Sequence, residues 1–380
     1  MNEYIKFLDN YKNKDVSYNE LMNIVNISNF EYNSCFKKTK KKNNYEIWKN
    51  KHEVKNEVFL EQKNINIDIN INNLDDLINI IEKYPYEKNY KYNIDLKSLH
   101  LIRNELIDLN NMIGMDGIKN SILNQLLYFL QKLHINTKGE SDYKHTIIYG
   151  PPGTGKTEIA QIIGKMYSKI GILKNNIFKK VTRNDLVAGY LGQTALKTTD
   201  VIKSCLGGCL FIDEAYSLGN SNDLDSFSKE CIDTLCENLS NHKNDLMVII
   251  AGYEEDINNL LLNINKGLDS RFIWRFKIEN YNSKNLLDIF QKKINDIDWK
   301  LDDNVINIKW FEEHLNHFKN FGRDIEKFIS NIKIVHAKRI FGKDEENIKK
   351  INIDDINNGF DQYKNNNNAY VEKINYNLYV

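Results

Sequence analysis

The stretch His145–Thr157 reads HTIIYGPPGTGKT and fits the pattern G-x-x-x-x-G-K-[S/T], with its last Gly at 155, Lys156 and Thr157. The apolar residues Thr146–Tyr149 predict a strand before it, and the run EIAQIIGKMY predicts a helix after it. A strand, a glycine-rich loop and a helix in this order are the context in which the pattern forms a phosphate-binding loop.

The residue types of this loop suit a nucleotide. Glycines let backbone N–H groups turn inward around a β-phosphate, and the start of the following helix adds a positive dipole end. Lys156 would place a charge near the β- and γ-phosphates, and the Thr157 hydroxyl can bind Mg²⁺. We therefore predict that the loop contacts ATP through Pro152, Gly153, Thr154, Gly155, Lys156, Thr157 and Glu158.

A second segment, CLFIDEA, begins at Cys209. Four apolar residues followed by two acids predict a buried strand that ends in carboxylates. Asp213 would hold Mg²⁺ through water, and Glu214 would orient and activate the attacking water. An ordinary acidic strand-to-helix junction would look the same in isolation, and the phosphate-binding loop upstream favours the catalytic interpretation.

The pattern of apolar and polar residues changes along the chain. Short apolar runs alternate with helical stretches between residues 106 and 282, which indicates a parallel sheet covered on both faces. Residues 283–380 are helical in pattern without further apolar strands. We predict an α/β P-loop domain at 106–282 and a helical lid with a C-terminal tail at 283–380.

Residues 1–105 contain no glycine and are rich in Asn, Lys and Tyr. Isoleucines alternate with polar residues from Ile65 to Ile71, which predicts a strand, and apolar residues at helical spacing from Leu74 to Ile81 predict a short helix before Pro85. We predict a small α+β N-terminal domain of unknown role at 1–105.

Composition excludes several classes of protein. The 380 residues carry 52 basic and 52 acidic side chains, so the net charge is zero, which disfavours a general nucleic-acid coat. No apolar run approaches the roughly 18 residues of a membrane span, and the N-terminus lacks the pattern of a secretory signal, so we expect a cytoplasmic protein without a membrane partner.

The lysines within 37–44 are expected to be a solvated run, with nucleic-acid binding as the alternative. The five cysteines lack a C-x-x-C pair, which favours reduced thiols over zinc ligands.

Together, GPPGTGKT, LFIDEA and the helical C-terminal region resemble AAA+ ATPases. The finer resemblance is to the CbxX/CfqX group, which includes red-type Rubisco activase and a bacterial sporulation ATPase. It spans about residues 105–340 and does not include the first 105. The segments that carry it are Asn110–Lys119, Val181–Thr198, Gly207–Leu218, Val248–Ile257, Gly267–Phe272 and Phe321–Ile329.

The resemblance implies roles for residues outside the two motifs. Ile113 and Gly114 match the segment that approaches adenine. Tyr190, Leu191 and Gly192 match a pore loop that grips a polypeptide in the central channel of a ring, although a Tyr packed on a loop would look similar.

Arginines in the matching segments also acquire implied roles. Arg271 matches the arginine finger that reaches the neighbouring subunit's γ-phosphate, and Arg323 matches the lid arginine called sensor 2. Tyr253 stands where most of the superfamily has the polar sensor 1 residue, which leaves its role open. Arg275 is either a second interfacial arginine or a solvated strand residue.

The resemblance implies an Mg²⁺-dependent ATPase that forms a ring, expected to be a hexamer, and remodels a protein partner that the sequence does not identify. Two alternatives use the same ATP-binding core. One is a motor or loader that handles nucleic acid, and the other is a nucleotide-switched assembly scaffold with little turnover.

Overall fold

The structure is a computed structural model of the chain and describes residues 63–377, apart from 191, 220–225, 264 and 344–347, with side chains described to residue 366. The chain divides into the units Met1–Glu61 and Gln62–Val380, and every element below belongs to the second unit. The lysine run at 37–44, Cys35 and the pore-loop residue Leu191 lie outside the described residues.

A five-stranded parallel sheet forms the centre of the predicted α/β domain, with strand order β4-β5-β6-β3-β7. The predicted strands at 146–149 and 209–212 are confirmed as β3 and β5, and a third apolar run, Leu246–Ala251, forms most of β6. The strands are β3 (Thr146–Tyr149), β4 (Phe178–Val181), β5 (Cys209–Ile212), β6 (Met247–Gly252) and β7 (Trp274–Lys277).

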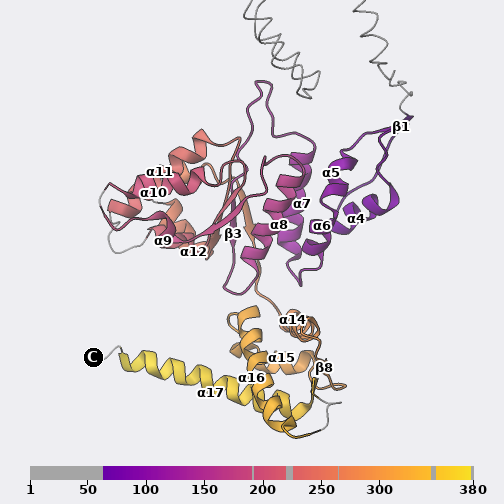
Figure 1. The fold of residues 1–380 in the computed structure, drawn as a ribbon, viewed down its shortest axis with the longest axis vertical. Helices are drawn as coiled ribbons and strands as arrows, with labels where there is room; N and C mark the ends of the chain where they lie inside the picture. The colour runs from indigo at the N-terminus through magenta and orange to yellow at the C-terminus, as the bar shows by residue number, and fades with distance from the viewer. Residues whose placement is uncertain (1–62, 191, 220–225, 264, 344–347, 378–380) are drawn as a thin grey trace, which may run out of the picture. The chain divides into compact units, whose positions relative to one another are not determined.

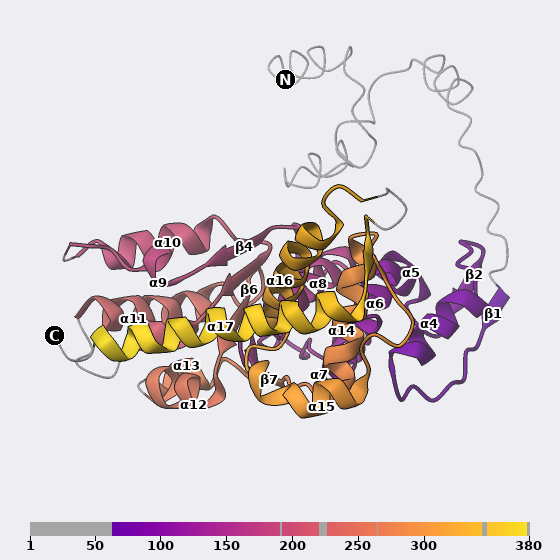
Figure 2. The same ribbon diagram turned by 90° about the horizontal axis from the view of Figure 1, so that it is seen from below.

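Helices cover both faces of this sheet, as the alternation of strands and helices predicts (Figures 1 and 2). The longer helices are α7 (Asp116–Leu130), α8 (Lys156–Lys169), α10 (Thr194–Lys203) and α11 (Ser226–Asn241). The short elements between them are α9 (Arg183–Leu186), the 3₁₀ turn η1 (Ala215–Gly219), α12 (Glu254–Asp256), the π-helical turn η2 (Ile257–Leu262) and α13 (Lys266–Asp269).

Successive residues of the central strands enter different cores. Ile148 and Ile249 belong to a cluster with α7 and α8, whereas Ile147 and Val248 belong to a cluster with α10 and α11. Side chains alternate between the two faces of a strand, so a strand that is apolar at every position must be buried on both faces. The continuous apolar runs in the sequence have this physical cause.

The N-terminal part of the described chain comprises β1 (Lys63–Ile65), α4 (Leu74–Lys83), β2 (Tyr90–Tyr92), α5 (Leu96–Leu101) and α6 (Arg103–Asn110). Helix α4 confirms the predicted helix before Pro85. The strand expected over residues 65–71 is wrong beyond Ile65, because the Asn93 side chain bonds both the N–H and the C=O of Ile67 at 2.9 and 3.0 Å. These backbone groups are therefore not available to a neighbouring strand.

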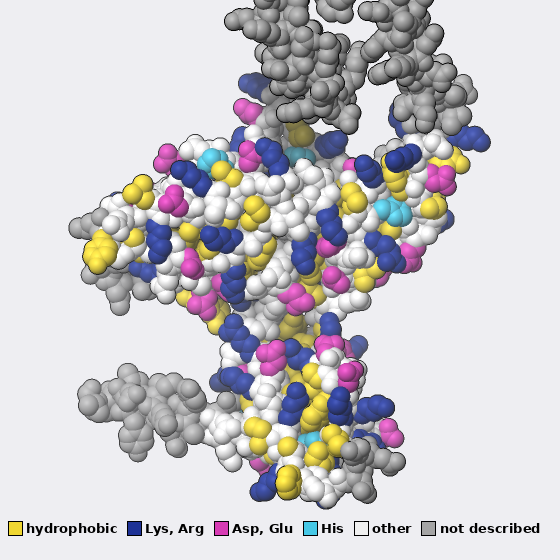
Figure 3. Space-filling view, viewed as in Figure 1, with side chains coloured by type: hydrophobic (Ala, Val, Ile, Leu, Met, Phe, Trp, Pro, Cys, Tyr) yellow, Lys and Arg dark blue, Asp and Glu magenta, His cyan; other side chains and the backbone are white. Residues whose placement is uncertain are grey.

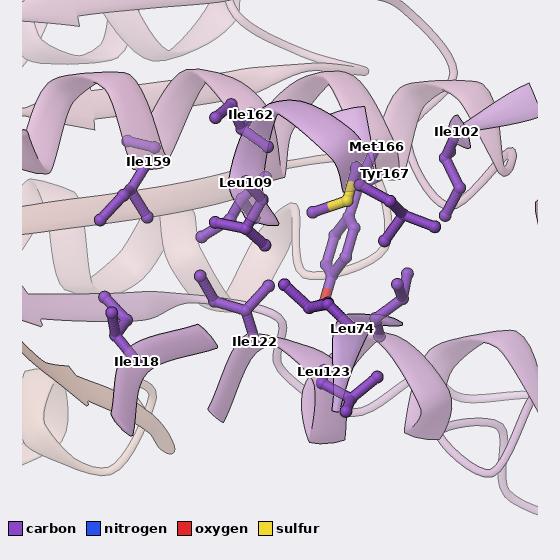
Figure 4. Packing of buried hydrophobic residues seen from close by; sticks show 14 of the residues in the cluster. Leu74, Ile102, Leu109, Ile118, Ile122, Leu123, Ile159, Ile162, Met166 and Tyr167 are labelled. Carbon is purple, nitrogen blue, oxygen red and sulfur yellow. The ribbon is translucent and has the colours of Figure 1, made fainter. Parts of the chain in front are cut away.

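Helices α4 to α6 pack on α7 and α8 in a single hydrophobic cluster (Figure 4). Leu74, Ile102 and Leu109 contribute to this cluster together with Ile122 and Met166. The hydrophobic core is thus continuous across residue 105, and the predicted domain boundary at that position stays a prediction.

Tyr167 on α8 lies in the same cluster, fully buried (Figure 4). Its hydroxyl has no hydrogen-bond partner among the described residues, and burial raises the pKa of this phenol well above its usual value. An unsatisfied buried polar group costs about 1–3 kcal/mol. We expect Tyr167→Phe to leave the free energy of unfolding unchanged or to raise it by about 1 kcal/mol in denaturant titrations.

Tyr149→Phe is the matched control, because its hydroxyl donates to Asn258 at 3.1 Å, and its removal should lower that free energy by about 1 kcal/mol. If Tyr167→Phe is destabilising by as much as Tyr149→Phe, the hydroxyl of Tyr167 makes a favourable interaction and the expectation is wrong.

The C-terminal part of the chain is helical, with a third hydrophobic cluster of its own. A two-stranded parallel pairing joins the segments before α15 and α17. Its elements are α14 (Ser283–Asp296), β8 (Lys300–Leu301), α15 (Ile308–His314), the 3₁₀ turn η3 (Leu315–His317), α16 (Gly322–Ile340), β9 (Lys350–Ile351) and α17 (Ile353–Asn377). In the described part of the chain, no helix combines the length and apolar character needed to cross a membrane.

Candidate active site

A cleft of about 720 Å³ opens at the C-terminal ends of β3, β5 and β6 and is completed by residues of α14 and α16. It brings together twelve residues predicted from the sequence. They are Ile113, Pro152, Gly153, Thr154, Gly155, Lys156, Thr157, Glu158, Asp213, Glu214, Tyr253 and Arg323. Gly114 lies between two residues that line the cleft, whereas Arg271 and Tyr190 do not line it.

Two glycines give the phosphate-binding loop its conformation. Gly153 has φ +75° and Gly155 has φ +84°, values in the left-handed region that side chains disfavour. Gly155 precedes the first turn of α8, and Lys156 opens that helix. The Lys156 ammonium donates to the carbonyls of Gly150 and Pro151 at 2.8 and 2.7 Å. The loop therefore folds around the amine that would contact phosphate.

The charge state of Lys156 depends on its surroundings. Burial lowers the pKa of its ammonium to about 8, and nearby Arg323 acts in the same direction. Asp213 and Glu214 oppose this shift. A bound phosphate strongly stabilises the charged form of a cation that is partly desolvated in this way, because the anion replaces the lost water.

The two predicted Mg²⁺ ligands converge on one point. The Asp213 carboxylate lies 2.7 Å from the ammonium of Lys180, and the Thr157 hydroxyl lies 3.3 Å from the same ammonium. A carboxylate and a hydroxyl are oxygen ligands of the kind that Mg²⁺ takes, and both already face a cation here. The residues present therefore fit the metal that the fold family implies.

Glu214 adopts a strained backbone conformation. Its φ of 50° lies in the left-handed region, at a cost of about 1–3 kcal/mol for a residue other than glycine. The Glu214 N–H donates to the Asp213 carboxylate at 3.1 Å, and its C=O accepts from Ser217 in the turn η1. This backbone conformation turns the chain after β5, and the Glu214 side chain is exposed in the cleft.

Part of the cleft lining is apolar and suited to a flat aromatic base. This part includes Met112, Ile113, Met115 and Ile289 of α14. Gly114 has φ +65°, and a Cβ there would lie 3.0 Å from the Asn285 amide. Met112, Met115 and Ile289 were not among the residues predicted from the sequence. Ile289 and the other cleft residues of α14 are spaced so that they lie on one face of the helix. This spacing could have indicated Ile289 from the sequence.

The helical C-terminal region approaches the phosphate-binding loop through backbone atoms. The Gly322 N–H donates to the Gly153 carbonyl at 3.2 Å, and a Cβ on Gly153 would lie 2.1 Å from the Asn320 carbonyl. Such an approach requires glycine at this position. It places Arg323, the first residue after Gly322, in the cleft beside the loop.

The other two arginines of interest lie elsewhere. The Nε of Arg271 donates to Ser240 at 2.7 Å, and its guanidinium also donates to the Gly267 carbonyl. Arg275 lies exposed on β7 and pairs with Asp269. Arg271 therefore does not line the cleft of its own chain, and its role as an arginine finger stays a prediction.

Two tyrosines of interest are exposed. Tyr190 is 74% exposed on the loop before α10, and an added Cβ on Gly189 or Gly192 would meet no atom within 4 Å. Tyr253 is 42% exposed at the start of α12, and its ring centre lies 6.0 Å from that of Tyr216. Tyr253 lines the cleft, and its role as sensor 1 stays a prediction.

Comparison with known proteins agrees with this geometry. Residues 146–274 match the family described as "ATPase family associated with various cellular activities (AAA)". A cfxQ-like protein of Acanthamoeba polyphaga mimivirus is 41% identical over 300 residues, which are 78% of this chain and 73% of that protein. Stage V sporulation protein K of Bacillus subtilis is 33% identical over 213 residues, 53% of this chain and 66% of that protein.

Another relative is much longer than the region it shares. The ESX-1 secretion system protein EccA1 of Mycobacterium tuberculosis is 40% identical over 187 residues, which are 48% of this chain and 32% of that protein. Among solved structures, the FIGL-1 AAA domain in complex with ADP aligns with a TM-score of 0.50 at 17% identity, over 66% of this chain and 82% of that one. The last similarity concerns the fold alone. With the nucleotide cleft and the long match to the cfxQ-like protein, the chain belongs to the AAA family of ATPases, in its CbxX/CfqX-like group.

Proposed function

We propose that the protein is an Mg²⁺-dependent ATPase that assembles into a ring, expected to be a hexamer, and uses ATP to remodel a protein partner. In this proposal, Lys156, Thr157, Asp213 and Glu214 act from one subunit. Arg271 acts on the nucleotide of the neighbouring subunit and couples hydrolysis to assembly. The position of Arg271 outside its own cleft supports this division.

Within the chain, Lys156, Arg323 and the Thr157 hydroxyl would hold the phosphates and their metal. Mg²⁺, when bound, would neutralise phosphate charge and polarise the γ-phosphate. Glu214 would accept a proton from the attacking water, because its carboxylate is exposed in the cleft directly after Asp213. The apolar wall around Ile113 and Ile289 would take the base and exclude water from it.

The observation that carries the remodelling proposal is the exposure of Tyr190. A large aromatic ring that is 74% exposed between two glycines gives up packing in its own chain. Such an exposed ring can pack against any extended polypeptide without reading its sequence. The names of two relatives connect them to a secretion system and to sporulation, which is compatible with work on protein partners.

The nucleic-acid alternative has less support. On the face seen in Figure 3, lysines and arginines are interspersed with acidic side chains and form no single-sign stripe. Proteins that track a phosphate backbone present a positively charged groove instead.

The test uses Glu214→Gln, a variant that should bind ATP without hydrolysing it and stay bound to its protein partner, the client. Client capture should be lost when Tyr190→Ala is added, with ATP binding and assembly retained. Phe341→Ala is the matched control, since Phe341 is 90% exposed but lies after α16, and it should leave capture unchanged. Capture that survives Tyr190→Ala, or an ATPase rate stimulated by DNA with steep salt dependence, would contradict the proposal.

A further inference from the structure

The side chain of Lys180 joins the two residues that are expected to hold Mg²⁺. Lys180 lies on β4, an edge strand of the sheet, in register with Phe211 of β5. Its ammonium lies 2.7 Å from the carboxylate of Asp213 and 3.3 Å from the hydroxyl of Thr157. The same nitrogen lies 5.8 Å from the centre of the Phe211 ring. One side chain therefore bridges motifs that are far apart in the sequence.

These contacts place a positive charge where a metal would also be drawn. Mg²⁺ demands close, nearly octahedral oxygen ligands at about 2.0–2.1 Å, with several of its waters retained. The ammonium of Lys180 already uses the space between the same carboxylate and hydroxyl oxygens. Two cations a few ångströms apart repel each other, and the repulsion grows where water is partly excluded, as at Asp213, whose side chain is 18% exposed.

We propose that Lys180 is a tethered cation that competes with Mg²⁺ for Asp213 and Thr157 and so sets the Mg²⁺ concentration at which the site binds Mg-nucleotide. The inference rests on the proposed function, which supplies Mg²⁺ as the metal. A lysine suits the role because its ammonium is a compact point charge on a flexible stem. The Lys180 side chain is 46% exposed, so it can swing into solvent when the metal enters.

A different role for the same contacts would be direct binding of phosphate. A lysine that binds phosphate adds to nucleotide affinity whether or not a metal is present. A lysine that competes with the metal changes the amount of Mg²⁺ that is needed. The two roles therefore differ in a measurable quantity that does not depend on turnover.

The experiment measures ADP binding calorimetrically to the full chain, in EDTA and over a series of free Mg²⁺ concentrations. Lys180→Met keeps the length of the stem and removes the charge. Lys179→Met is the matched control, because Lys179 is the neighbouring lysine of β4 and its ammonium donates to the Ser204 hydroxyl at 2.9 Å instead. We expect the Mg²⁺ concentration that gives half of the gain in ADP affinity to fall about fivefold in Lys180→Met and to stay unchanged in Lys179→Met.

Three results would overturn the proposal, each in a distinct way. An unchanged Mg²⁺ half-point in Lys180→Met, with ADP affinity also unchanged, would show that the lysine competes with neither the metal nor the nucleotide. An unchanged half-point together with weaker ADP binding in EDTA and in Mg²⁺ alike would identify Lys180 as a phosphate ligand. ADP binding by the unaltered protein that does not respond to Mg²⁺ at all would contradict the proposed Mg²⁺ dependence itself.

Discussion

Replacing Glu214 with Gln should reduce ATP turnover by about 10²–10⁴-fold while ATP still binds, because the amide cannot accept a proton from the attacking water. The substitution keeps the size of the side chain and the backbone bond from residue 214 to Asp213. Steady-state phosphate release and equilibrium ATP binding measure the two effects separately.

Glu255→Gln is the matched control for this variant. Glu255 is an exposed acid of α12 that does not line the cleft, and its replacement should leave turnover unchanged. Glu214→Gln with normal turnover would show that the proton acceptor lies elsewhere and would remove Glu214 from the catalytic site.

Replacing Arg271 with Ala should reduce turnover by about 10³-fold or more, because an arginine donated across an interface stabilises the charge of the transition state. The loss should appear although Arg271 does not line the cleft of its own chain. ADP binding to each subunit should be retained, since the nucleotide contacts within the chain are unchanged.

Arg271 also donates to Ser240 and Gly267, so thermal unfolding must accompany the rate measurement. Arg103→Ala is a suitable control, because Arg103 and Glu82 form an exposed ion pair that is far from Arg271 in the sequence. Loss of this pair should change neither the turnover rate nor assembly. Full turnover by a stable Arg271→Ala protein would contradict the shared site.

The central part of the fold could be predicted from the sequence because burial on both faces leaves a strong signal. Strands β3, β5 and β6 are inner strands of the sheet and read as continuous apolar runs. The edge strand β4 (FKKV) was not predicted, and β7 (WRFK) entered only through the alternative that Arg275 is a solvated strand residue. An edge strand tolerates charged side chains, so its composition resembles that of a loop.

Much of the candidate site was also predictable, since the phosphate-binding loop and the acidic strand end are short motifs with local geometry. Met112 and Met115 carry no signal of their own, and only their position beside Ile113 and Gly114, in the segment matched to the approach to adenine, could have indicated them. The contact of Lys180 with Asp213 and Thr157 depends on β4 lying beside β5, which only the tertiary structure establishes. The strand expected up to Ile71 failed because a distant side chain, Asn93, takes the backbone bonds at Ile67.

The most direct test of the account mixes two inactive proteins and measures ATP turnover. Lys156→Ala should destroy its own cleft but still offer Arg271 to a neighbour, and Arg271→Ala should keep an intact cleft. If the site is shared between subunits, the mixture should recover a substantial fraction of turnover that neither variant shows alone. A mixture that stays as inactive as its components, although the two variants co-assemble, would contradict the shared site.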